Sequence, residues 1–173
     1  MNYKSQILVT ILLCLLSSSQ GLQGAPQGYG LGKRPFLMVQ VCLGSEKNLP
    51  VFIGVMRSIA RSESMKFIDN SAQTQKDLES IGENIPHAKP TGQIVNIGVE
   101  RGDGVGLGAG NLGLPKNQVA IGFSEGANSR DARKFADAVV HRLGERWSVE
   151  VVPPNEGARG MKTCSEQPED TSK

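Results

Sequence analysis

Three successive runs of alternating residues between Gln93 and Phe123 constrain the fold of this chain more than any other feature. In each run, apolar residues alternate with small or polar ones, which is typical of strands that bury only one face. Arg101-Gly102-Asp103-Gly104 and Leu114-Pro115-Lys116-Asn117 are turn signals between the runs. The stretch therefore predicts an antiparallel meander.

The rest of the chain predicts helices and strands around this meander. Apolar residues recur at helical spacing over 49–63 and again over 128–146, where Asn128 is expected to cap the helix. The nearly continuous apolar run 36–43 predicts a buried central strand. Short strands are expected at 65–68 and 148–152.

The polar stretch 69–91 has the weakest pattern. Thr74 and Asp77 form a partial capping box, so a short helix is expected there, with Leu78 and Ile81 on its buried side.

The order of these elements predicts an α+β fold. An antiparallel sheet with two main helices packed on one face satisfies this order, and the ferredoxin-like arrangement βαββαβ, or a close variant with an extra meander strand, is the simplest template. We expect a single domain at 35–153, followed by a polar tail at 154–173. Only Met161 and Cys164 could anchor this tail.

Residues 1–21 have the pattern of a secretory signal peptide. Lys4 precedes an apolar run over 7–16, and small residues at 19 and 21 suit cleavage after Gly21. The apolar run is too short to span a bilayer, and Leu12 and Leu13 before Cys14 disfavour lipidation. The sequence therefore predicts an exported protein, periplasmic or extracellular, with a flexible Gly-rich leader at 22–34 and no stable membrane anchor after cleavage.

Cys42 and Cys164 remain after removal of the signal peptide. Because an exported protein meets an oxidising compartment, this even pair predicts a disulfide. A reactive thiol is the alternative, which is less favoured because no histidine lies near either cysteine in the sequence.

The composition excludes several function classes. Nineteen Lys and Arg residues stand against 17 Asp and Glu, which leaves no basic excess of the kind expected for nucleic-acid binding. His87 and His141 do not occur in a zinc spacing, so no metal is expected. Residues 108–113 match G-x-G-x-x-G, but Pro115 and a β pattern follow instead of a helix, so no nucleotide or other cofactor is expected.

Glycine occupies every second position of the middle run. Such a strand has one face without side chains, which permits close approach by a helix of the same domain, by another backbone or by a partner. The candidate partner-binding residues are on this strand and on the turn before it, where Arg101-Gly102-Asp103 also matches an integrin tripeptide that is common by chance. They are Asp103, Gly104, Gly106, Gly108 and Gly110.

These features favour a non-enzymatic module that binds another protein. An inhibitor or immunity-type protein that neutralises a secreted enzyme or effector is the specific expectation. One alternative is a small exported hydrolase centred on Ser124 and Glu125 with a distant histidine, His87 or His141. The other is a small-ligand-binding envelope protein, which would need an apolar pocket.

Overall fold

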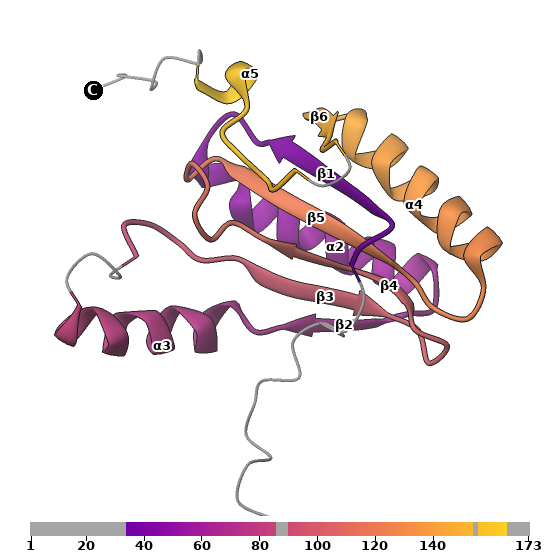
Figure 1. The fold of residues 1–173 in the computed structure, drawn as a ribbon, viewed down its shortest axis with the longest axis horizontal. Coiled ribbons are helices and arrows are strands. Elements are labelled where there is room, and N and C mark those ends of the chain that lie inside the picture. The colour runs from indigo at the N-terminus through magenta and orange to yellow at the C-terminus, as the bar shows by residue number, and fades with distance from the viewer. Residues whose placement is uncertain (1–33, 86–89, 154–155, 166–173) are drawn as a thin grey trace, which may run out of the picture. The chain divides into compact units, whose positions relative to one another are not determined.

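A six-stranded antiparallel sheet with strand order β2-β3-β4-β5-β1-β6 is the central element of the structure, a computed structural model that describes residues 34–85, 90–153 and 156–165 (Figure 1). The predicted signal peptide, the leader up to residue 33 and His87 lie outside the described residues. The strands are β1 (Leu37–Cys42), β2 (Lys66–Asp69), β3 (Asn96–Glu100), β4 (Val105–Gly110), β5 (Gln118–Glu125) and β6 (Ser148–Val151). The helices are α2 (Leu49–Ser62), α3 (Ser71–Asn84), α4 (Ser129–Gly144) and α5 (Lys162–Ser165), with a 3₁₀ turn η1 (Glu46–Asn48).

The predicted α+β fold with two main helices on one face of an antiparallel sheet is confirmed. The strands β6, β1, β5 and β4 are neighbours in that order, which is compatible with the ferredoxin-like template. The sheet continues beyond β4 with two further strands, β3 and β2, and α3 connects these two strands in the chain. The extension is therefore larger than the single extra strand expected from the sequence.

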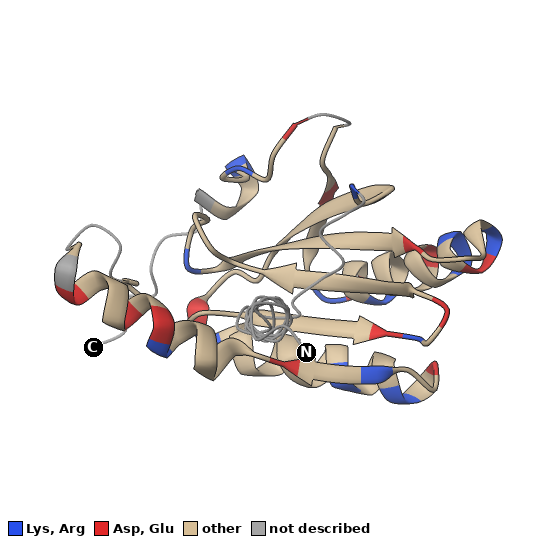
Figure 2. Cartoon of the chain, turned by 60° about the horizontal axis from the view of Figure 1, so that its bottom comes forward, with Lys and Arg blue, Asp and Glu red and all other residues tan. Residues whose placement is uncertain are grey.

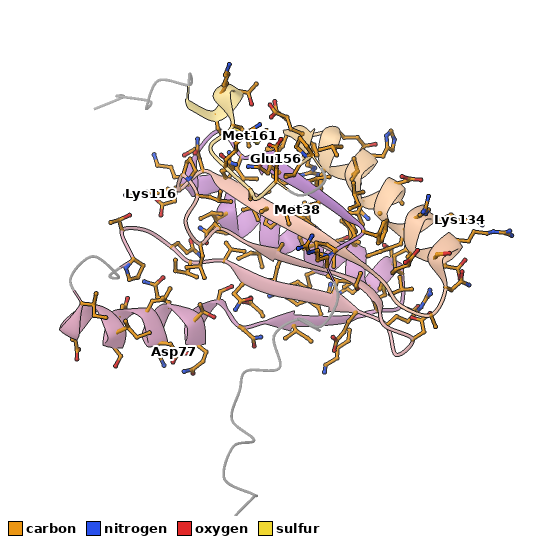
Figure 3. All side chains as sticks on the ribbon, in the orientation of Figure 1. Met38, Asp77, Lys116, Lys134, Glu156 and Met161 are labelled. Carbon is orange, nitrogen blue, oxygen red and sulfur yellow. A yellow bond between two sulfur atoms is a disulfide. The ribbon has the colours of Figure 1, made fainter. Side chains whose placement is uncertain are left out.

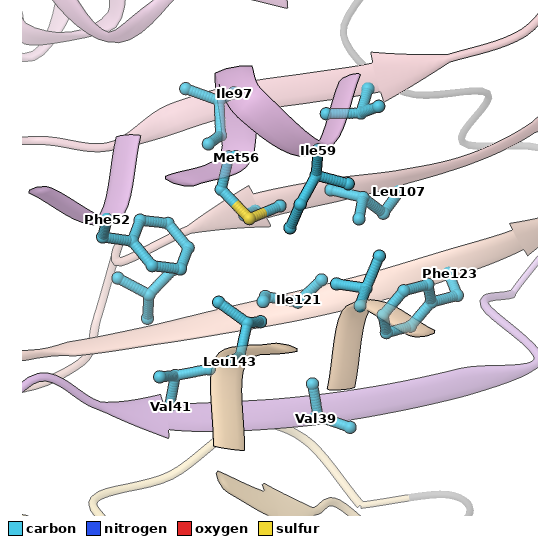
Figure 4. Close-up of a cluster of buried hydrophobic side chains, with 14 of the residues drawn as sticks. Val39, Val41, Phe52, Met56, Ile59, Ile97, Leu107, Ile121, Phe123 and Leu143 are labelled. Carbon is cyan, nitrogen blue, oxygen red and sulfur yellow. The ribbon is translucent and has the colours of Figure 1, made fainter. Parts of the chain in front are cut away.

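The core lies between the sheet and the helices α2 and α4. Alternate residues of β1, β4 and β5 are fully or nearly fully buried against the apolar stripes of these helices, as the close-up in Figure 4 shows. The ring of Trp147 lies 5.9 Å from that of Phe52, and Trp147 packs against this core. The main contributors are Val39, Val41, Leu107, Ile121 and Phe123 from the strands, with Phe52, Met56, Ile59, Phe135, Val139 and Leu143 from the helices.

The helix in the polar stretch is longer than expected and begins earlier. α3 has 14 residues and starts at Ser71, and Asn70 before it makes no side-chain cap. Thr74 does not begin the helix. Its hydroxyl accepts a hydrogen bond from the side chain of Asn96 on β3 at 2.8 Å. Ile81 is 48% exposed, so the prediction of a buried Ile81 is wrong, because α3 extends past the end of β2 in Figure 1.

The predicted disulfide between Cys42 and Cys164 is confirmed. The two Cα atoms are 5.4 Å apart, which is a usual separation for a bridge. Met161 packs against the two cysteines and is almost fully buried. The bridge therefore attaches the C-terminal segment to the end of β1, and it fits a protein of an oxidising compartment.

Candidate interaction surface

Strand β4 directs its glycines away from the two main helices. Val105, Leu107 and Ala109 belong to the core that α2 and α4 cover. Because successive residues of a strand point to opposite faces, Gly106, Gly108 and Gly110 lie on the other face of the sheet. Neither of these helices therefore packs on these glycines.

The register of the sheet places glycines of three neighbouring strands side by side. Gly108 of β4 pairs with Gly98 of β3 and with Gly122 of β5, and we call these three residues the glycine row. Ile68 on β2 and Met38 on β1 continue the row at its two ends. With neighbouring strands about 4.8 Å apart, the five positions span roughly 19 Å. The middle of this span has no side chains.

The sequence contains a signal for the glycine row on the strands that flank β4. Gly98 and Gly122 each occupy an alternating position of their own strand, on the same side as Asn96 and Ala120. Three adjacent strands with glycine on one face predict a side-chain-free patch once their order and register are known.

Two other glycines of β4 have internal roles. A Cβ atom added to Gly106 would lie 2.3 Å from the carbonyl oxygen of Val99, and one added to Gly110 would lie 3.3 Å from that of Val95. The first distance is far shorter than any van der Waals contact, so Gly106 allows the close approach of the β3 backbone. Of the candidate glycines on β4, Gly108 is therefore the one at the centre of the glycine row.

Asp103 and Gly104 form a turn that attaches to the loop between β5 and α4. Gly104 has φ +85°, and its neighbour across the loop, Gly126, has φ +58°. The carbonyl oxygen of Asp103 accepts a hydrogen bond from the N–H of Ala127 at 3.0 Å. A Cβ on Gly126 would lie 2.4 Å from the N atom of Val105, so both glycines serve this internal contact.

The carboxylate of Asp103 is bonded within its own turn. It accepts hydrogen bonds from Nε and Nη2 of Arg101 at 3.0 and 2.7 Å, and from the N–H of Val105 at 3.1 Å. The hydrogen bond from Arg101 lowers the pKa of Asp103 below its usual value, and the same bond raises the pKa of Arg101. The two charged groups of the Arg101-Gly102-Asp103 tripeptide therefore bind each other.

The C-terminal segment covers the neighbouring part of the same sheet face. It crosses β1 and β5 in Figure 1, and Met161 is labelled there in Figure 3. The amide nitrogens of Gln40 and Gln118 donate hydrogen bonds to the carbonyl oxygen of Arg159, and Oε1 of Gln118 accepts from the N–H of Met161 at 2.9 Å. Both glutamine side chains are buried. They were missed as sequence signals, although a glutamine inside an apolar strand indicates a specific buried partner.

Pro35 lies on the same face, next to one end of the glycine row. A Cβ added to Gly122 would be 3.3 Å from Cβ of Pro35. Along the glycine row itself, Gly98 is buried, whereas Gly108 and Gly122 are half-buried. The row is therefore most accessible at β4 and β5.

The residues of the hydrolase alternative do not form a catalytic arrangement among the described residues. The hydroxyl of Ser124 donates to the carbonyl oxygen of Gly104 at 2.9 Å, on the sheet face opposite α4. His141 is exposed and lies 3.6 Å from the carboxylate of Glu145 on α4. α4 begins at Ser129, shortly after Ser124 in the sequence, and His141 is near its other end. At a helical rise of about 1.5 Å per residue, His141 lies roughly 18 Å along the helix from Ser129. A serine and a base need hydrogen-bond distance for nucleophilic catalysis.

The described part of the chain has neither a metal centre nor a helix that could span a membrane. No group of three or more His, Cys, Asp or Glu side chains there could hold a metal ion. None of the described helices has the length and apolarity needed to cross a bilayer. Two surface hollows of about 590 and 510 Å³ lie beside α2 and the end of α4 and are open to solvent.

Comparison with known proteins identifies no relative: no family model, no curated protein and no solved structure matches the chain.

Proposed function

We propose that this chain is an exported, non-enzymatic protein-binding module, of the inhibitor or immunity type, that neutralises a secreted enzyme or effector. The glycine row carries the proposal. Three neighbouring strands have no side chain at the centre of a sheet face, and Ile68 and Met38 flank this centre. A sheet face without side chains allows a partner to approach closely and to contact main-chain atoms.

The disulfide supports the export part of this proposal. A bridge over 122 residues connects the start and the end of the described chain, and such bridges persist in oxidising compartments. The predicted signal peptide at 1–21 agrees with this location.

The test compares Gly108→Val with the unchanged protein in a pull-down from the native extract. Valine suits a strand, so we expect the melting temperature to be retained. Its branched side chain would prevent close approach, so the partner captured by the unchanged protein should be lost. Gly102→Ala is the matched control, because a Cβ at Gly102 meets no atom within 4 Å.

A second variant separates binding from folding. Gly106→Ala places a Cβ against the Val99 carbonyl oxygen, so we expect it to lower the free energy of unfolding by about 1–3 kcal/mol. If Gly108→Val keeps both its melting temperature and its capture of the partner, the glycine row is not the binding surface. If the melting temperature of Gly108→Val falls as that of Gly106→Ala is expected to, the glycine row has an internal packing role.

A further inference from the structure

A groove between α2 and α4 lies on the side of the sheet opposite the glycine row. It has a volume of about 510 Å³ and runs between the first half of α2 and the last turns of α4. Arg142 in the last turn of α4, together with Glu145 and Arg146 just after its end, lines one side. The other side is lined by Val51, Gly54, Val55 and Ser58 of α2.

Gly54 is the first unusual residue of this groove. It lies in the interior of α2, where glycine is less favourable than alanine. A Cβ atom added to Gly54 meets no atom within 4 Å, so no contact among the described residues requires a glycine there. The missing side chain instead keeps the α2 wall of the groove open.

Two guanidinium groups of the groove have no carboxylate partner among the described residues. Arg142 donates to the neutral hydroxyl of Ser58 at 3.0 Å, and Arg146 is exposed. Glu145, the one acidic residue of the groove, lies 3.6 Å from His141. α2 itself contains Arg57 and Arg61 and no acidic residue (Figure 2).

Exposed apolar surface adjoins these charges. Val51 is 47% exposed although it is a large aliphatic side chain. A ligand that complements the groove therefore combines apolar contact with Val51 and Val55 and two negative charges about one helical turn apart. The mixed apolar lining and the carboxylate of Glu145 disfavour a nucleic-acid backbone, which presents phosphates alone.

We propose that this groove is a second docking site, which takes an acidic, amphipathic helical segment of a partner protein. Carboxylates of the segment pair with Arg142 and Arg146, and its apolar face lies over Val51 and Gly54. The proposal concerns a different surface from the glycine row and does not depend on the function proposed there.

The test uses a defined helical peptide, labelled with fluorescein, that has a leucine stripe and glutamates at positions i and i+4. We expect the purified protein to bind this peptide in fluorescence anisotropy, and to bind less tightly as salt is raised. The same peptide with lysine in place of glutamate should not bind. Arg142→Gln combined with Arg146→Gln should weaken binding about tenfold or more. The matched control is Arg133→Gln with Lys134→Gln, which removes two exposed charges from the first turns of α4 and should leave affinity unchanged.

Gly54→Ala distinguishes docking from a structural role of the groove. Alanine should raise the melting temperature by a few degrees, because it favours the helix and fits without contact. It should also weaken peptide binding, because the added methyl group narrows the groove. Gly108→Val should bind the peptide as the unchanged protein does, so this result is separate from the fate of the glycine row.

Four outcomes would overturn the proposal. These are no peptide binding, equal loss in the Arg133/Lys134 control, unchanged affinity in Gly54→Ala, or tighter binding of a thymidine oligonucleotide than of the acidic peptide.

Discussion

The carboxylate of Asp103 illustrates how a residue that invites a binding interpretation can be used internally. Its three hydrogen bonds come from Arg101 and Val105, and its carbonyl oxygen accepts from Ala127. The integrin-like tripeptide is visible in the sequence, but the partner of its charges is not. A turn residue is assigned as structural only when the loop packed against it is known.

The lowered pKa of Asp103 predicts a specific pH dependence of stability. A carboxyl group whose pKa is lower in the folded state stabilises the fold above its unfolded pKa, and this contribution is lost as pH falls through the folded value. We expect Asp103→Asn to lower the urea midpoint at neutral pH, because the charge paired with Arg101 is removed. This difference from the unchanged protein should begin to shrink as pH falls below about 4, the usual pKa of aspartate, and should vanish only below the lowered pKa of folded Asp103.

Urea titrations at a series of pH values test this expectation, with Asp137→Asn as the control, since Asp137 is an exposed residue of α4. A difference between Asp103→Asn and the unchanged protein that persists in acid would show that the charge of Asp103 is not its cause.

At the scale of elements, the sequence predicts helices and strands where local pattern and tertiary packing agree. α2 and α4 follow the predicted apolar spacing, and Asn128 caps α4 by accepting from the N–H of Asp131. The predicted helix is shorter than α3 because the first polar residues of α3 form hydrogen bonds with β3, which the local sequence pattern does not reveal. The hydroxyl of Ser71 accepts a hydrogen bond from the N–H of Asn96, and that of Thr74 accepts from its side chain. The position of the glycine row likewise depends on strand register, which no local pattern contains.

The attachment of the C-terminal segment to β5 predicts the effect of changing Gln118. Gln118→Met preserves the approximate size of the side chain and removes its bonds to the backbone of Arg159 and Met161. Because Gln118 is fully buried, the N–H of Met161 loses this buried hydrogen bond, while the carbonyl oxygen of Arg159 keeps the one from Gln40. We expect a loss of about 1–3 kcal/mol in the free energy of unfolding.

Urea denaturation with an unchanged m-value measures this loss. Gln73→Met is the control, because Gln73 is an exposed residue of α3 whose bond to Asp77 is replaceable by water, and it should change stability by less than about 0.5 kcal/mol. An equally small effect of Gln118→Met would mean that water replaces the lost bonds there too.

At the scale of the whole molecule, the disulfide between Cys42 and Cys164 is expected to contribute strongly to the free energy of unfolding. It closes a loop of 122 residues, for which chain entropy gives an upper estimate of roughly 4–5 kcal/mol. Replacing both Cys42 and Cys164 with serine should lower stability by up to this amount. Denaturation of the variant beside the unchanged protein measures it, and the unchanged protein in reducing buffer should match the variant. If reduction has no effect on the urea midpoint, the bridge does not stabilise the fold.

The strand order has a consequence for when this chain can fold. β1, the first strand to leave the ribosome, lies between β5 and β6, the last two. Val39 finds its neighbours only when Ile121 and Val151 have been synthesised. Contacts this distant in sequence form slowly, because the loops between them must close first. Strand β1 therefore stays without its sheet neighbours until the C-terminal third of the chain has been synthesised, whereas β2, β3 and β4 can pair with one another earlier.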